Sequence, residues 1–372
     1  MNATCEPRSP RAVRISSSPA ELAGLGTLLK CVQAGVGDVP ALLALAKDVG
    51  DTAPRPGAGR TALLWEILAS VTAVDVAAGR ILEPHLDAAA ILAQAGGAAA
   101  ADFASDRVSD RVPDSVPFEG AWGVFAAEAP GLTLEAGDAA GRTVLNGSKP
   151  WCSIAAQLDH AVLTARLAGG GRAAFAVNLH AAGVSFADPK WTSLGLREVP
   201  SGTVHFEAVP AIPLGGAGWY YQRPGFAWGG IGVAACWLGG AVAVARSYQG
   251  ALQKAADGGR EPDQLALAHL GEIDRTLAAL IQYFARTAAR IDAGELSGPG
   301  AWSEALRVRG GAAAAVERIQ TLVSQNLGPG PLAFDPRYAK RMADLSLYIR
   351  QHHGMRDDAQ LGALTFKGGH PW

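Results

Sequence analysis

A stretch of twenty uncharged residues, FAWGGIGVAACWLGGAVAVA at 226–245, is the feature that most constrains the fold of this chain. A helix of this length without a charge must either cross a bilayer or be buried on all sides. Five of its residues are glycines and no second stretch of this kind occurs. We therefore expect a helix buried at the centre of a bundle and no membrane span.

The period of the apolar residues divides the rest of the chain, whose 372 residues exceed what one hydrophobic core usually supports. Helical spacing extends from residue 20 to about residue 100, and the acidic, Pro-punctuated stretch at 105–117 is typical of a connector. These patterns predict a flexible N-terminus at 1–19 and an N-terminal helical domain at 20–117.

Residues 118–215 have a shorter period, with β-branched and aromatic residues standing between glycine turns. In TVHFEAV, for example, Val204, Phe206 and Ala208 alternate with His205 and Glu207. The short spacing between such runs favours antiparallel strands in a small barrel or sandwich, so we expect a middle β domain here.

Helical spacing returns after Gly218 and predicts three long helices, followed by a fourth from about Pro336 to His353. Residues 216–372 should therefore form a C-terminal four-helix bundle. Because helices and strands occupy separate blocks of sequence, the predicted fold class is α+β.

The composition argues against several kinds of partner. The formal net charge is −2 and no run rich in Lys or Arg occurs, so nucleic acid is not expected to bind. The four cysteines are far apart, which predicts neither a zinc site nor a disulfide framework and fits a reducing cytoplasm. The first residues contain no apolar segment of the kind found in secretory signals.

Several strings, together with the order and sizes of the blocks, resemble the flavin-dependent acyl-CoA dehydrogenase superfamily. FAAEAPG at 125–131 is similar to the family's loop with a Thr-Glu-Pro string, and NGSKPWCS at 146–153 resembles its Asn-Gly-x-Lys-x-Trp-Ile-Thr/Ser stretch. RPGFAWGGIG, from Arg223, resembles the opening of the family's bundle helix. The resemblance implies the family's three-domain fold and an FAD cofactor.

The resemblance implies a flavin site at the end of a strand. Trp151 would pack against the isoalloxazine ring and the Ser153 hydroxyl would hydrogen-bond its N5 and O4 edge, beside the loop that carries Ala127 and Glu128. A flavin needs such a flat apolar contact and such a donor. Without the cofactor, Trp151 would be an ordinary half-buried strand aromatic and Ser153 a turn residue.

A second part of the resemblance concerns the adenosine half of FAD. QNLGPGPL, from Gln325, is similar to the family's Gln-x-x-Gly-Gly-x-Gly turn, which meets a cofactor bound mainly to a neighbouring subunit. Gln325 and Gly328 are therefore implied cofactor contacts, and a homodimer or homotetramer is implied with them. The turn here contains Pro329, which lacks an N–H donor, and the family's Arg-x-x-Phe-Gly string is absent.

The family's catalytic glutamate is missing from both of its usual positions. The first usual position lies eight residues after the Asp of an Arg-Asp pair; counted from Asp344, this position is His352. The second lies directly before the Arg that opens the bundle helix; before Arg223 this chain has Gln222. Neutral His accepts a proton near pH 7 and Gln does not, which makes His352 the candidate base. Alternatively, His352 and His353 simply cap the end of a helix. Arg223 and Gln222 are candidate substrate contacts.

Three functions fit these residues. The first is an FAD-dependent oxidoreductase that carries out α,β-dehydrogenation of an acyl thioester or related substrate. The second is a flavin monooxygenase of the same fold, in which His352 deprotonates an aromatic or heteroatom substrate. The third is a family member that binds flavin or an acyl group without catalysis.

Overall fold

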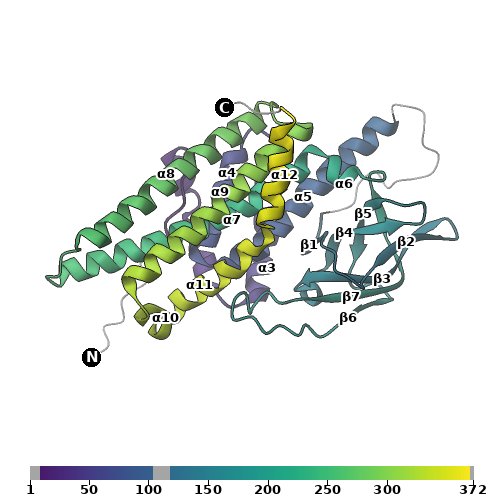
Figure 1. Cartoon of the computed structure of the whole chain (residues 1–372). Helices are drawn as coiled ribbons and strands as arrows, with labels where there is room; N and C mark the ends of the chain where they lie inside the picture. The colour runs from purple at the N-terminus through teal and green to yellow at the C-terminus, as the bar shows by residue number, and fades with distance from the viewer. Residues whose placement is uncertain (1–8, 104–117, 369–372) are drawn as a thin grey trace.

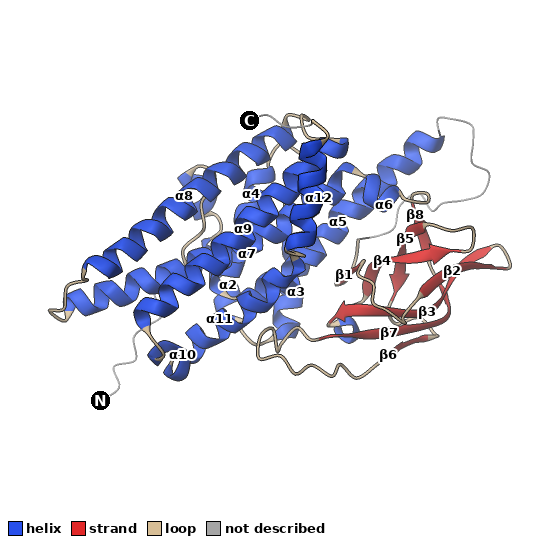
Figure 2. Ribbon diagram, in the orientation of Figure 1, coloured by secondary structure: helices blue, strands red, loops and turns tan. Residues whose placement is uncertain are grey.

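The computed structural model describes residues 9–103 and 118–368. Long helices form an elongated bundle, and a β domain is packed at one end of it (Figures 1 and 2). The predicted α+β class, with a β domain between two helical regions of sequence, is confirmed. The predicted connector at 105–117 lies outside the described residues.

The N-terminal region is helical, as its apolar spacing predicted. Asp38 caps the third helix by accepting a hydrogen bond from Ala41 N at 3.0 Å. The fourth helix is not amphipathic, because almost all of its residues are buried. The helices are α1 (Pro19–Ala23), α2 (Gly26–Ala34), α3 (Val39–Gly50), α4 (Thr61–Val74) and α5 (Val76–Phe103).

Part of the segment expected to be a flexible N-terminus is bound to α4. The backbone N–H groups of residues 15, 16 and 17 donate to Glu66 Oε1 over 2.6, 2.8 and 3.0 Å. Val13 and Ile15 are buried. Residues 13–17 therefore differ from the expectation, because one buried carboxylate satisfies three of their backbone donors at once.

The middle region is an eight-stranded sheet with the order β6-β7-β3-β2-β4-β5-β8, and β1 pairs with β4 off this path. The expected antiparallel pairing is wrong for two pairs, since β1 and β2 both run parallel to β4. The strands are β1 (Trp122–Phe125), β2 (Leu134–Ala139), β3 (Arg142–Ser153), β4 (His160–Leu167), β5 (Arg172–Asn178), β6 (Val184–Phe186), β7 (Ser201–Pro210) and β8 (Ile212–Leu214).

The alternation expected for β7 ends earlier than the sequence indicated. Val204 and Phe206 are buried, but Ala208 is exposed and Val209 is buried in its place. Ala208 has a positive φ of 49°, and its N–H donates to Asn146 Oδ1 at 2.8 Å where the pairing with β3 shifts register. This local bulge moves the inward position by one residue.

The C-terminal region contains the three long helices that were predicted. The predicted fourth helix ends at Tyr348, five residues early, and continues as a 3₁₀ turn, η2 (Ile349–Gln351). A further helix, α12, follows it. The helices are α6 (Trp219–Gln222), α7 (Pro224–Asp257), α8 (Gln264–Asp292), α9 (Gly298–Leu327), α10 (Gly330–Phe334), α11 (Pro336–Tyr348) and α12 (Met355–Phe366).

Helix α7 carries the uncharged stretch and lies at the centre of the bundle. It is the one described helix whose length and composition would suffice for a membrane span, and 78% of its most apolar window is buried by the rest of the fold. A Cβ atom at Gly239 would lie 2.0 Å from the Ala69 carbonyl oxygen of α4. Glycine is therefore required for this approach of the two helices, and the expected buried helix is confirmed.

Candidate functional site

The end of strand β3 exposes one aromatic side chain and buries the hydroxyl next to it. Trp151 is 57% exposed and has a positive φ of 59°, at an irregularity in the pairing of β3 with β7. Ser153 is only 8% exposed. The backbone turn thus presents a flat apolar indole at the surface and points a hydroxyl into the interior.

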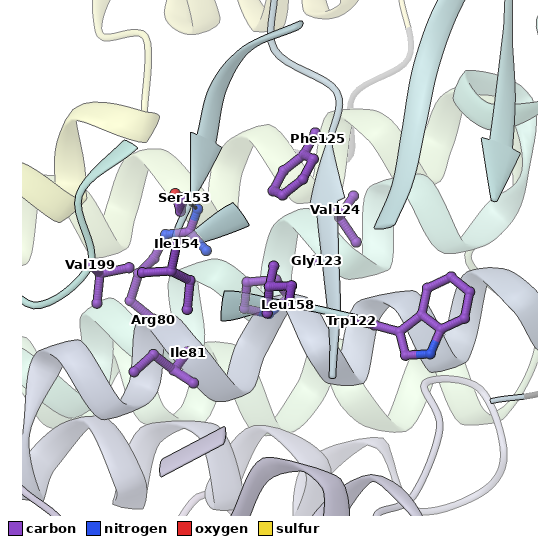
Figure 3. Close-up of a pocket in the computed structure, with 11 residues that line it drawn as sticks. Arg80, Ile81, Trp122, Gly123, Val124, Phe125, Ser153, Ile154, Leu158 and Val199 are labelled. Atoms are coloured by element: carbon purple, nitrogen blue, oxygen red, sulfur yellow. Dashed lines mark hydrogen bonds between the residues drawn. The ribbon is translucent and has the colours of Figure 1, made fainter. Parts of the chain in front are cut away.

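The Ser153 hydroxyl is connected to the helical region by Arg80 of α5. One guanidinium nitrogen of Arg80 donates to Ser153 Oγ at 3.2 Å, and Ser201 Oγ lies 2.8 Å from the same oxygen. Arg80 and Ser153 line a small cavity together with Ile154 and residues of β1 (Figure 3). The sequence interpretation named Ser153 and missed Arg80.

A buried lysine holds the loop that follows β1 near this strand. Lys149 Nζ donates to the Thr164 backbone oxygen at 2.7 Å and to Thr164 Oγ1 at 3.0 Å, and Thr164 Oγ1 donates to Ala126 O at 3.4 Å. Burial lowers the pKa of Lys149 to about 8, against the opposing charge of Glu128. The 126–128 loop and the end of β3 are therefore neighbours.

Glu128 is held by cations of the sheet. Its carboxylate lies 3.2 Å from Arg172 Nε and 4.0 Å from a terminal nitrogen of Arg166. Ala127 and Glu128 are both exposed at the surface of the β domain. The structure thus gives Glu128 ion pairs with two arginines of the sheet.

His352 follows the 3₁₀ turn η2, beyond the end of the helix on which its predicted inward position relied. Its side chain is 10% exposed, and its Nε2 lies 3.7 Å from Asp357 Oδ2. Its ring centroid is 6.5 Å from that of Trp237. Burial lowers the pKa of His352, while Asp357 opposes the shift. His353 is mostly exposed and also contacts Asp357, with Nδ1 at 3.2 Å from Oδ1.

A pocket of about 380 Å³ lies between α5, α7, α9 and α12, and His352 does not line it. Aromatic rings of Tyr220, Phe226 and Trp302 form part of its wall. Charged groups form much of the rest and come from three different helices and a helix opening: Glu83, Asp87, Arg223, Arg309 and Asp357.

Arg223, a predicted substrate contact, is a buried member of this pocket. Its side chain is 2% exposed, donates to Gln94 Oε1 at 2.9 Å and approaches Asp87 Oδ1 to 3.9 Å. Its guanidinium also lies over the Tyr220 ring, 5.1 Å from the centroid. Gln222 is exposed and lines an adjoining pocket of about 530 Å³, which shares Arg223 and Phe226 with the first.

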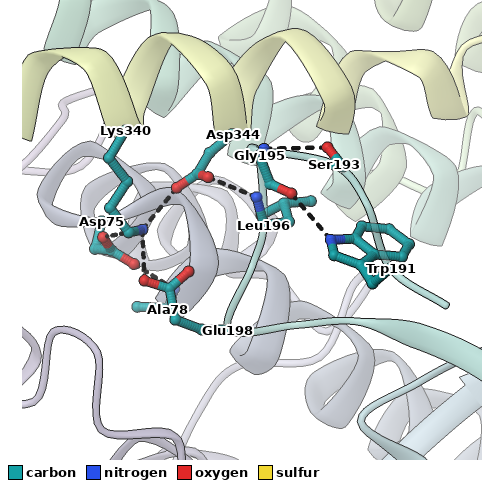
Figure 4. Close-up of polar contacts among 9 residues, drawn as sticks. All are labelled: Asp75, Ala78, Trp191, Ser193, Gly195, Leu196, Glu198, Lys340 and Asp344. Carbon is teal, nitrogen blue, oxygen red and sulfur yellow. Dashed lines mark hydrogen bonds and ion pairs between the residues drawn. The ribbon is translucent and has the colours of Figure 1, made fainter. Parts of the chain in front are cut away.

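Asp344 anchors a loop. Its Oδ1 accepts a hydrogen bond from Leu196 N at 2.6 Å, and its Oδ2 accepts one from Lys340 Nζ at 2.6 Å (Figure 4). Lys340 also reaches Asp75 Oδ2 at 2.9 Å and Glu198 Oε1 at 3.4 Å. Burial would lower the pKa of Lys340, but Asp75 and Asp344 outweigh it and raise that pKa.

Gln325 and Gly328 lie at the end of α9, next to α10 and remote from the β domain (Figure 1). Gln325 is exposed, and Gly328 ends the helix with a φ of 66°. A single chain therefore does not bring them to Trp151 and Ser153. Their contact with a cofactor of a neighbouring subunit stays a prediction.

Three of the charged groups that the sequence interpretation missed could have been found from their spacing in the sequence. Arg80, Glu83 and Asp87 recur at spacings of three and four in the apolar segment RILEPHLD, which places them on one side of α5. Arg309 and Asp357 carried no comparable signal, because only the packing of α9 against α12 brings them together. Within residues 9–103 and 118–368, no three His, Cys, Asp or Glu side chains are grouped as metal ligands would be.

Comparison with known proteins matches the middle of the chain to a domain family and finds solved structures with a similar fold. Residues 127–209 match the family model for the acyl-CoA dehydrogenase middle domain. No curated protein matches the sequence. Similar solved structures include KijD3 in complex with FMN and dTDP-3-amino-2,3,6-trideoxy-4-keto-3-methyl-D-glucose, at 19% identity and a TM-score of 0.76, covering 95% of each chain.

Two further solved structures share the fold over most of their length. TdsC from Paenibacillus sp. A11-2, with FMN and indole, is 16% identical with a TM-score of 0.74, covering 95% of this chain and 98% of that one. The nitrososynthase from Micromonospora carbonacea var. africana is 19% identical with a TM-score of 0.70, covering 89% of this chain and 92% of that one. At these identities the likeness establishes the common fold.

Proposed function

We propose that this chain is a flavin-dependent oxidoreductase of the acyl-CoA dehydrogenase-like superfamily that oxygenates a polar aromatic or heteroatom substrate. The observation that carries this proposal is the charged lining of the 380 Å³ pocket. An acyl chain placed against Glu83, Asp87 and Arg309 would remove water from these charged groups and offer them no hydrogen bonds in return, which is costly. A substrate with hydrogen-bonding groups avoids that cost.

The residues at the end of β3 fit a flavin ring. Trp151 offers an exposed flat face, Ser153 a buried hydroxyl and Arg80 a cation beside that hydroxyl. A bound flavin would supply the two-electron redox chemistry. Arg80 and Ser153 would then donate hydrogen bonds to the ring edge where negative charge accumulates on reduction, and the positive charge of Arg80 would stabilise it.

The identity of the flavin is part of the proposal. The resemblance to dehydrogenases implies FAD, whereas the structures of KijD3 and TdsC named above contain FMN. Pro329 in the turn after α9 removes one N–H from the site expected for the adenosine half of FAD. We therefore expect FMN and FAD to bind with more similar affinities than in a dehydrogenase of this family.

His352 was predicted as the base and has an indirect position. It does not line the pocket, but its Nε2 lies 3.7 Å from Oδ2 of Asp357, which does. As a base, His352 would therefore act through Asp357. Neither of the positions where the family usually carries its glutamate, 352 and 222, holds a carboxylate in this chain.

Oligomeric state and location complete the proposal. A homodimer or homotetramer would bring Gln325 and Gly328 of one subunit toward the flavin of another. A small polar molecule is the expected substrate, as in KijD3 with its bound sugar nucleotide, and a cytoplasmic location is expected.

The test begins with flavin binding. We expect the purified protein to bind FMN or FAD, and we expect Ser153→Ala and Trp151→Ala each to weaken binding about tenfold, the equivalent of roughly 1.4 kcal/mol for one lost contact. Ser185→Ala, an exposed serine of β6, is the matched control. Protein that takes up neither flavin by absorption or fluorescence titration refutes the proposal.

The reaction class is tested separately. The flavin-loaded protein is incubated anaerobically with a panel of acyl-CoA thioesters, and bleaching of the flavin would identify a dehydrogenase. Chemically reduced flavin is then exposed to oxygen with indole as a probe, and the products are analysed by mass spectrometry. Addition of one oxygen atom supports oxygenation, whereas acyl-CoA bleaching contradicts it.

A further inference from the structure

Glu83 of α5 is a buried carboxylate that borders the pocket. It is 8% exposed and lines the 380 Å³ pocket. It also lines a small cavity against α4, together with Trp65 and Trp228. Ionised carboxylates are seldom buried to this extent unless a partner compensates them, so its hydrogen-bond partners decide its role.

The two cations nearest to Glu83 have their hydrogen bonds elsewhere. Arg80 donates to Ser153 Oγ, and its other terminal nitrogen forms an ion pair with Glu83 Oε2 at 3.6 Å, which is too long for a hydrogen bond. Arg309 donates to the backbone oxygens of Gly230 at 2.9 Å and Gln351 at 2.7 Å. Among the residues that the structure describes, none donates a hydrogen bond to Glu83. A ligand that donates one would remove a desolvation cost.

The surroundings of Glu83 specify what kind of ligand fits. Phe226 and Trp302 of the same pocket lie with ring centroids 5.2 Å apart and planes tilted by 30°, which offers a flat apolar contact. Arg223 Nε is buried without a hydrogen-bond partner among the described residues. The pocket therefore combines an aromatic wall, an unused acceptor and an unused donor.

Glu83 is also connected to the candidate flavin edge. Arg80 touches Ser153 with one nitrogen and approaches Glu83 with the other. The Arg80 side chain would therefore link a molecule bound between Glu83 and the aromatic wall to the candidate flavin edge. His352, in contrast, does not line the pocket, although the adjacent His353 does.

We infer that Glu83 is the catalytic base of this pocket and that the substrate is an aromatic compound bearing an O–H or N–H group. This inference rests on the proposed function. In the step, the ionised carboxylate forms an O–H bond while the substrate O–H or N–H bond breaks, and the bonding electron pair stays on the substrate oxygen or nitrogen. The substrate becomes electron-rich, and Glu83 returns its proton to solvent through the pocket opening.

The electrostatic environment matches this role. Burial raises the pKa of Glu83 to about 7, with Asp87 acting in the same direction and Arg80 and Arg309 opposing it. Cys236 of α7 and Tyr348 of α11 also face the carboxylate. Because the raised pKa belongs to an acid, Glu83 becomes an acceptor as the pH rises through about 7.

The experiment measures binding of phenol to the flavin-free full-length protein by calorimetry between about pH 5.5 and pH 8.5. Phenol stays neutral in this range, since phenols titrate near pH 10. We expect its affinity to rise about tenfold as Glu83 ionises, because a hydrogen bond to a charged acceptor is stronger than one to a neutral group. Glu83→Gln should remove the rise, and Glu83→Asp should restore part of it.

The controls separate the alternatives. Glu261→Gln makes the same chemical change at an exposed position between α7 and α8 and should keep the rise. Thermal unfolding of each variant shows whether it is folded. No phenol binding, a flat pH profile in the wild type, or an unchanged rise in Glu83→Gln overturns the inference. If His352→Gln loses the pH-dependent rise in phenol affinity and Glu83→Gln keeps it, the base is His352, and the inference is overturned as well. Failure of flavin binding would refute the proposed function and is measured independently.

Discussion

Replacing Asp344 by alanine should release the loop between β6 and β7 from the helical bundle. The Asp344 side chain is buried and accepts hydrogen bonds from Leu196 N and Lys340 Nζ, both at 2.6 Å. Leu196 is itself buried and has a left-handed φ of 51°. The loop presses closely on α11, since a Cβ atom at Gly195 would lie 2.4 Å from the Ala343 oxygen.

The size of the effect follows from these contacts. The alanine variant leaves the buried Leu196 N–H without an acceptor, which costs about 1–3 kcal/mol. It also removes one of three carboxylates around Lys340, while Asp75 and Glu198 remain, so we add about 1 kcal/mol for that loss. A total of about 3 kcal/mol corresponds to roughly a hundredfold change in a local opening equilibrium.

Hydrogen exchange of the Leu196 amide measures this opening directly. We expect exchange to accelerate roughly a hundredfold in Asp344→Ala and less than tenfold in Asp344→Asn, which keeps an acceptor oxygen and loses only the charge. Asp48→Ala, an exposed residue of α3, serves as the control. Equal acceleration in the alanine and asparagine variants would refute the assignment of the effect to the Leu196 hydrogen bond.

Two further predictions concern stability. Burial lowers the pKa of His85 to about 4, below the value of about 6.5 expected in the unfolded chain, so the unfolded state takes up a proton first as the pH falls. The free energy of unfolding should therefore decrease from about pH 6.5 to about pH 4, and His85→Gln should reduce that decrease; equal pH profiles from urea titrations would contradict this. Gly239→Ala should destabilise the protein by more than about 2 kcal/mol, because the new Cβ atom would meet the Ala69 oxygen. Gly250→Ala in the same helix places its Cβ atom in open space and should stabilise the protein by up to about 1 kcal/mol. Similar melting temperatures for the two variants would show that α4 and α7 are not in close contact.

The fold could be predicted from the sequence where local periodicity dominates. The long helices of the bundle have strong 3.6-residue patterns, and the uncharged length of α7 required burial on all sides. Parallel pairing of β1 with β4 could not be predicted, because it joins strands separated by the β2–β3 hairpin. The end of α11 at Tyr348 was missed for a similar reason, since the apolar spacing continues through the 3₁₀ turn.

The candidate site was predictable only in part. A local string suggested Trp151 and Ser153 and helical spacing suggested His352, and the roles of these residues stay predictions. Glu83 and Arg309 belong to different helices whose charged side chains meet only in the folded bundle. A sequence pattern identifies which side of a helix is polar, but it does not identify which helix packs against that side.

The position of the β domain within the chain has a consequence for synthesis of the protein. Helix α4 packs against α7, with Ala69 contacting Gly239, and all eight described strands lie between them in sequence. On the ribosome, α4 emerges long before α7, so the part of its apolar surface that contacts α7 stays uncovered until then. The pairings of the sheet all lie within residues 122–214, so the β domain can complete its folding first. We expect nascent chains that end before α7 to depend on chaperones, and chains that include it to lose that dependence.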